Sequence, residues 1–173
     1  LLKYLQAFNG ASVEELNSVK EHASNAVLQE LVDPLVNRGE RSVHGARHAL
    51  LQFDAVKNLK GHPEHGALIE ALLASSTGDV AALKRPGTIS EEQFQIIVEN
   101  TRLVSLCTVS TDTGVISFAD VANAMQIAEE EVEDWIVRAV TANLIEARID
   151  QLQGRVIIDR AEPREFDRTQ WAE

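Results

Sequence analysis

Hydrophobic and polar positions between residues 115 and 160 follow an order that predicts two short helices and then a β-hairpin. Apolar residues at three-and-four spacing mark the first helix, at Phe118, Val121, Ala122 and Met125. The same spacing marks the second helix, at Val132, Trp135, Ile136, Ala139, Val140 and Leu144. Alternation of apolar and charged residues then predicts a half-buried strand, made of Ile145, Glu146, Ala147, Arg148, Ile149 and Asp150.

A loop and a second apolar run complete the hairpin. Gln151 to Gly154 has the length of a hairpin loop, and Arg155 to Arg160 contains three consecutive apolar residues, which suit a strand with neighbours on both sides. Val115 and Ile116 follow turn residues and predict a short first strand. A hairpin this small is marginal alone, so it should lie on the two helices. The order is that of a winged helix, in which the first strand pairs with the third and the second keeps an open edge.

The chain before this module is predicted to be helical. Leu1 to Phe8 has the pattern of the last turns of a helix, and Ser12 with Glu15 forms a capping box for the next one. That helix is expected to end near Asp33. Its apolar face comprises Leu16, Val19, Ala23, Ala26, Val27 and Leu31.

Further helices and short loops follow. Residues 37–42 are a polar connector, and residues 46–59 predict two short helical segments broken near Phe53. A helix from Glu64 to about Ala74 is then expected to bury four residues, Leu68, Ile69, Leu72 and Leu73.

After that helix, a turn is predicted at Ser75 to Gly78 and a short helix at Asp79 to Leu83. Ser90 with Gln93 is a second capping-box candidate, opening a long helix that reaches Cys107. Alternating helices and short loops resemble a helical-repeat stack, although no sequence repeat is found. The predicted fold is therefore mainly α. It consists of a helical-repeat part over residues 1–114, a winged helix over 115–160 and a C-terminal tail over 161–173.

Charge separates this winged helix from those that read DNA. The chain carries a formal net charge of −11, and the 59 residues from 115 onward contain six Arg and no Lys against thirteen acids. In DNA-reading members the start of the second helix enters the major groove. Here that part carries acids at Glu129, Glu130, Glu131, Glu133 and Asp134. Phosphate would be repelled, so direct DNA reading is disfavoured. The wing, which is the hairpin loop from Gln151 to Arg155, and the scattered arginines leave an opening for RNA contact within a larger assembly.

No residue set in the sequence predicts catalysis or a bound metal or cofactor. Cys107 is the single cysteine and lies on an apolar stripe, as a core residue in a reducing compartment does. His44 and His48 are one helical turn apart but lack a third ligand. His62 and His65 are expected to be solvated in a turn. We therefore expect a protein that is not an enzyme. The sequence also contains no apolar run long enough to span a membrane and no pattern typical of a signal peptide. Because the chain begins inside a helical pattern, we also expect it to be a piece of something longer.

The helical part leading without a break into an acidic winged helix resembles the PCI domain, which occurs in subunits of the proteasome lid, the signalosome and translation initiation factor 3. The resemblance covers nearly the whole chain and is strong from Ile116 to Trp171, but weak from Ser42 to Arg85. Its most specific parts are Glu131-Val-Glu133, the IVRAV core, Ile149-Asp150-Gln151 and the ending Phe166…Gln170-Trp171. The Gln170-Trp171 ending favours initiation factor 3.

The resemblance implies a cytoplasmic, non-catalytic scaffold subunit. Its partners would be other PCI subunits, with the A subunit of initiation factor 3 as a neighbour, and through them the small ribosomal subunit. From the residues themselves, an open strand edge and two aromatics in a polar tail favour subunit contacts. The predicted interface residues are Ile145, Glu146, Ala147, Arg148, Ile149, Asp150, Phe166 and Trp171.

Three alternatives stay open. One is a PCI subunit of the signalosome, its subunit seven, and another is an independent nucleic-acid-binding regulator. The third concerns the tail alone, where Phe166 and Trp171 could fold back onto the hairpin of their own chain.

Overall fold

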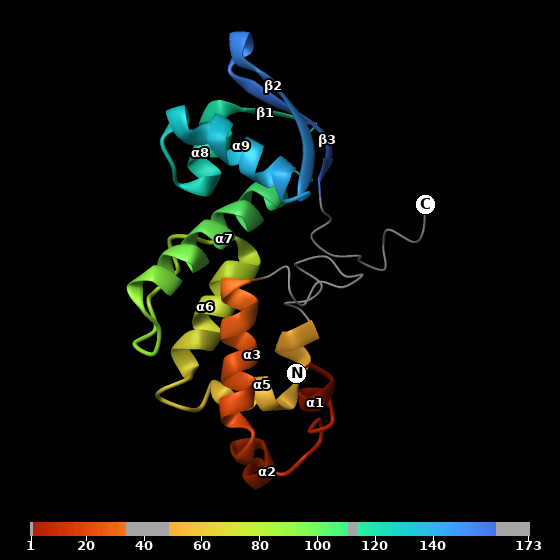
Figure 1. Ribbon diagram of the computed structural model, residues 1–173, viewed down its shortest axis with the longest axis vertical. Coiled ribbons are helices and arrows are strands. Elements are labelled where there is room, and N and C mark those ends of the chain that lie inside the picture. The colour runs from red at the N-terminus through yellow and green to blue at the C-terminus, as the bar shows by residue number, and fades with distance from the viewer. Residues whose placement is uncertain (1, 34–48, 111–113, 162–173) are drawn as a thin grey trace.

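The computed structural model describes residues 2–33, 49–110 and 114–161. In Figure 1 a group of helices and a winged helix occupy opposite ends of the molecule, and α7 runs from one to the other. The helices of the first group are α1 (Leu2–Gln6), α2 (Val13–Ser18), α3 (Lys20–Val32), α5 (Asp54–Leu59), α6 (Gly66–Thr77) and α7 (Glu91–Ser110). The winged helix consists of β1 (Val115–Ser117), α8 (Phe118–Met125), α9 (Val132–Thr141), β2 (Ile145–Asp150) and β3 (Arg155–Ala161). The prediction of a helical part followed by a winged helix is confirmed.

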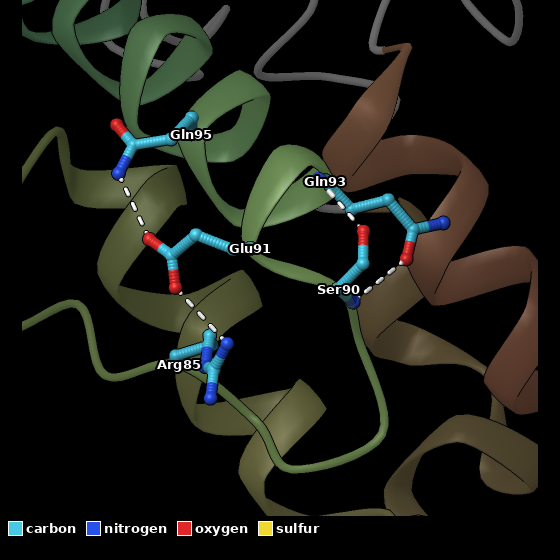
Figure 2. A network of polar contacts seen from close by, with 5 residues as sticks. All are labelled: Arg85, Ser90, Glu91, Gln93 and Gln95. Atoms are coloured by element: carbon cyan, nitrogen blue, oxygen red, sulfur yellow. Dashed lines mark hydrogen bonds and ion pairs between the residues drawn. The ribbon is translucent and has the colours of Figure 1, made fainter.

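Both predicted capping boxes form. The Ser12 N–H donates to the Glu15 carboxylate at 2.9 Å, and the Glu15 N–H donates to the Ser12 hydroxyl at 3.4 Å. Figure 2 shows the equivalent exchange at the start of α7, between Ser90 and Gln93 at 3.1 and 3.2 Å. The Arg85 guanidinium lies 3.0 Å from Glu91 in the first turn of the same helix. Each of the two capping boxes satisfies N–H groups that the first turn of a helix leaves without partners.

Three predictions about helix boundaries are wrong. The helix expected from Ser12 to Asp33 is divided at Val19, which has φ −106° and ψ 8° and separates α2 from α3. Residues 75–77 continue α6, which ends only at Gly78 in the left-handed conformation. Residues 79–83 form turns instead of a short helix. The turn-forming residues between Ser75 and Gly78 predicted an earlier end of the helix, because the sequence does not show that α6 packs along α3 and α7.

Burial also differs from expectation at the helix surfaces. Leu73 in α6 is 43% exposed, and Val140 in α9 is 41% exposed. Leu144 is buried but lies beyond the end of α9. Exposed fractions at these sites depend on which neighbours the helix meets, and periodicity does not supply that information. The predicted break near Phe53 is confirmed, because Phe53 separates a helical turn at 49–52 from α5.

Two hydrophobic clusters fill the two ends of the molecule, and α7 contributes to both. Ile97 packs in the cluster formed by the first six helices, whereas Val104, Leu106 and Cys107 pack with the winged helix. The prediction that Cys107 is a core residue is confirmed. Because the second cluster includes residues before 115, the winged helix rests on the C-terminal half of α7. The proposed division of the chain at residue 114 stays a prediction.

The sheet has the strand order β1-β3-β2, and both pairings are antiparallel. Ile116 lies opposite Val156, and Val156 also lies opposite Ile149. The central position of β3 explains its continuous apolar run. Gly154 turns the hairpin with φ 58°, as its position predicted.

Candidate interaction surface on the winged helix

β2 is the edge strand of the sheet, and it pairs only with β3 among the described residues. The Ile158 N–H donates to Gly114 on the β1 side of β3. In an antiparallel pair the N–H and C=O of one residue point to the same side. Ile158 lies opposite Ala147, so this pair does not exchange hydrogen bonds, and the N–H and C=O of Ala147 point away from the sheet. Two residues further on, the same groups of Ile149 also face the open edge.

A register shift near Glu146 and Ala147 limits the length of this edge. Ala147 pairs with Ile158, whereas Glu146 pairs with Arg160, so Asp159 is the extra residue on β3. Bulges of this kind strengthen the local twist of a strand and shorten the regular edge available for pairing. The regular part therefore begins at Ala147.

The charged residues of β2 are neutralised within the hairpin. Arg148 donates two hydrogen bonds to Asp159, at 3.1 and 2.8 Å, and this carboxylate raises the pKa of the guanidinium. Two more pairs join the strands across the hairpin, Glu146 with Arg160 at 2.7 Å and Asp150 with Arg155 at 3.0 Å. Each charged residue of β2 therefore already has a partner within its own hairpin.

An apolar groove of about 260 Å³ lies between α9 and β2. It is lined by Ile136, Val137, Val140, Thr141, Ala147 and Ile149. Val137 is 57% exposed, because it lies on the side of α9 away from the buried face of that helix. Hydrophobic periodicity did not place Val137 on the apolar face of the helix, because it lies among polar residues on the other face. Its one signal in the sequence was its place in the IVRAV core that carries the resemblance to PCI domains.

Trp135 anchors α9 on the opposite side. It is 6% exposed, as predicted, and two guanidinium groups lie over its ring. The Arg138 guanidinium is 4.9 Å from the ring centroid, and that of Arg102 from α7 is 5.6 Å away. Arg138 also lies 3.6 Å from Glu99 in α7. These contacts fix α9, and with it the groove, relative to α7.

The acidic start of α9 is exposed and borders the wing. Glu129–Glu131 form a 3-10 turn before the helix, and Ala128 donates its N–H to Glu131 at 3.0 Å. Gln151 in the wing donates to Glu133 at 2.8 Å. Asp134 is exposed, and no cation pairs with it within the described part of the chain. A DNA-reading surface here would place carboxylates against phosphates, which is unfavourable.

The histidines differ from expectation where the structure describes them. His65 is buried, with Nδ1 3.1 Å from the Ser24 hydroxyl and Nε2 3.6 Å from the Glu21 carboxylate. The prediction that His65 is solvated is therefore wrong, because α3 packs over the start of α6. Residues 34–48, with His44 and His48, lie outside the described residues, as do Phe166 and Trp171.

Neither a metal-binding cluster nor a membrane-spanning helix is found among the described residues. Within residues 2–33, 49–110 and 114–161, no group of three or more His, Cys, Asp or Glu is arranged to hold a metal ion. No helix in the same ranges is long and apolar enough to cross a membrane.

Comparison with known proteins gives the family context. Residues 81–160, from the loop before α7 to the end of β3, match the PCI domain. The chain is 26% identical to subunit M of eukaryotic translation initiation factor 3 from Coccidioides immitis over 91% of its own length and 34% of the relative's. The subunit M from Dictyostelium discoideum is also 26% identical, over 100% of this chain and 43% of the relative.

A shorter stretch gives a higher identity. The subunit M from Emericella nidulans is 32% identical over 47% of this chain and 19% of the relative. The chain thus spans less than half of the length of these curated relatives. The chain therefore matches the PCI domain over residues 81–160 and is similar to subunit M of eukaryotic translation initiation factor 3.

Proposed function

We propose that the chain is part of a scaffold subunit of translation initiation factor 3, and that its winged helix joins neighbouring subunits on the small ribosomal subunit. The observation that supports this most directly is the open edge of β2, at which Ala147 and Ile149 present backbone donors and acceptors. An exposed edge can pair with a strand of another chain. Likeness to subunit M over most of the chain favours initiation factor 3 over the signalosome.

The charges of the winged helix favour a protein partner over nucleic acid. Its described arginines, Arg138, Arg148, Arg155 and Arg160, each lie within 3.6 Å of a carboxylate. Binding to phosphates would require these ion pairs to be broken next to uncompensated acids. We therefore assign the surface to contacts with other PCI subunits, and the A subunit of initiation factor 3 is one proposed neighbour.

The proposal is tested by replacing Ala147 with Pro in the full chain and measuring co-purification of initiation factor 3 subunits. Proline removes the N–H that faces the open edge. We expect partner recovery to fall, while Ala147→Gly, which keeps that N–H, retains it. Circular dichroism of both variants checks the hairpin. Normal recovery with a folded Ala147→Pro chain would contradict pairing at this edge.

The tail is tested separately, because Phe166 and Trp171 are predicted interface residues outside the described structure. Trp171→Ala should reduce co-purification without lowering the melting temperature, since interface aromatics often contribute more than about 2 kcal/mol to binding. A fall in melting temperature with unchanged co-purification would favour the alternative that the tail packs on its own hairpin.

A further inference from the structure

We propose that the groove between α9 and β2 receives an extended segment of a partner protein that has apolar residues at alternate positions and basic residues at the end beside the wing. This inference rests on the proposed function, because it describes the partner of the same strand edge. It adds the chemistry that the partner needs, which neither the family match nor the names of the relatives supply.

The alternation follows from the register of β2. Residues directly opposite each other in paired strands have their side chains on the same face of the sheet. The backbone groups of Ala147 and Ile149 face the open edge, and their side chains line the groove. A strand added here would therefore place every second side chain over Val137 and Val140. Those two valines are 57% and 41% exposed, so the groove favours apolar side chains at these positions.

The charge requirement follows from the two ends of the groove. Near the start of β2, Glu146 is already paired with Arg160 and does not line the groove. Towards the wing, Asp134 lies one helical turn before Val137 and has no cationic partner among the described residues, and Glu133 is held by the neutral amide of Gln151. A lysine or arginine at this end of the partner would supply the missing positive charge.

Charge also explains why the edge of β2 does not select its partner through its own side chains. Asp150 and Arg148 are held by Arg155 and Asp159 on β3. A partner strand gains nothing by carrying charges opposite them, because the pairs are already made. Selection therefore falls on the apolar groove and on the acidic end of α9.

The test uses the full chain and three synthetic peptides, with binding followed by nuclear magnetic resonance. The first peptide has two lysines followed by alternating valine and threonine, to pair antiparallel with β2. The second has glutamates in place of the lysines, and the third has serine in place of valine. We expect the first to shift the amide signals of Ala147 and Ile149 and to bind roughly tenfold more tightly than either of the others.

Two variants with matched controls localise the contacts. Val137→Asn should weaken the first peptide roughly tenfold, whereas Val13→Asn, at a valine 65% exposed in α2, should not. Asp134→Asn should reduce the difference in affinity between the lysine peptide and the glutamate peptide. Glu14→Gln in α2 should leave this difference in affinity unchanged. Added salt should also reduce the difference in affinity between these two peptides, because the carboxylate of Asp134 is exposed to solvent and its interactions are screened.

The outcomes test the groove, the basic end of the partner segment and the proposed function separately. Equal binding of the valine and serine peptides, or no signal shift at Ala147 and Ile149, would overturn the groove as the docking site. Equal binding of the lysine and glutamate peptides would overturn the basic end. If the unmodified chain binds the first peptide but recovers no initiation factor 3 subunits, the proposed function fails while the inference about the groove stands.

Discussion

At the scale of single residues, Trp135 shows how one side chain can stabilise a core and orient a surface. Its ring is buried in the winged-helix cluster, and the guanidinium groups of Arg102 from α7 and Arg138 from α9 lie over it. Arg102 also donates to the backbone oxygen of Gln126 after α8. One aromatic residue therefore connects three helices around the base of the proposed docking surface.

Replacing Trp135 with Ala should cost about 3–5 kcal/mol of the free energy of unfolding, because it leaves a large cavity and removes both cation–π contacts. Trp135→Phe keeps an aromatic ring and should cost less. Thermal unfolding followed by circular dichroism measures both. A Trp135→Ala chain that melts with the parent would contradict the burial of this ring between α7 and α9.

At the scale of elements, the loop after α1 is fastened to the start of α5 by a reciprocal pair of hydrogen bonds. The Gly10 N–H donates to the Asp54 carboxylate at 2.9 Å, and the Asp54 N–H donates to the Asn9 side chain at 3.1 Å. The bond from Gly10 is the main reason that the pKa of Asp54 is lowered from its ordinary 3.8. The contact spans more than forty residues of sequence, and no local pattern predicted it.

Because the folded state lowers the pKa of Asp54, the stabilisation is present above pH 3.8 and is lost as the pH falls through the lower folded value. The variant Asp54→Asn should therefore melt below the parent at pH 7, and the difference should shrink as the solution is acidified below pH 3.8. Melting temperatures across this range measure the effect. A constant difference at all pH values would show that the charge of Asp54 is not responsible.

At the scale of the whole molecule, a seam of small residues joins the helical part to the winged helix. Gly78 at the end of α6 has φ 72°, and an added Cβ would lie 2.7 Å from Cα of Ser105 in α7. The Ser105 hydroxyl in turn donates to the backbone oxygen of Ala124 in α8 at 2.7 Å. Close packing at Gly78 therefore positions the segment of α7 on which the winged helix rests.

Gly78→Ala should destabilise the fold by more than about 2 kcal/mol, because backbone strain of about 1–2 kcal/mol adds to overlap with α7. Gly154→Ala provides a matched control, since Gly154 also has positive φ, at 58°, but open space where Cβ would lie. The Gly154→Ala variant should lose only the free energy that corresponds to the backbone strain at positive φ. Equal losses in melting temperature for the two variants would contradict the close approach.

Local sequence patterns determined the elements whose physical basis is local. The capping boxes at Ser12 and Ser90, the break at Phe53 and the turn at Gly154 follow from hydrogen bonds and dihedral preferences within a few residues. The strand order followed from the predicted winged-helix arrangement, in which the first strand pairs with the third, and the apolar run of β3 suits this central position. The resemblance to PCI domains completed the fold class.

Only the tertiary structure decided which faces meet. It ended α6 at Thr77 instead of Ala74, buried His65 beneath α3 and exposed Val140 beside Val137. It also paired the charges of β2 within its own hairpin. Each of these outcomes depends on a neighbour distant in sequence, whereas periodicity reports only that a face is apolar. The groove between α9 and β2 exists for the same reason, since no segment among the described residues covers the apolar side chains that these two elements bring together.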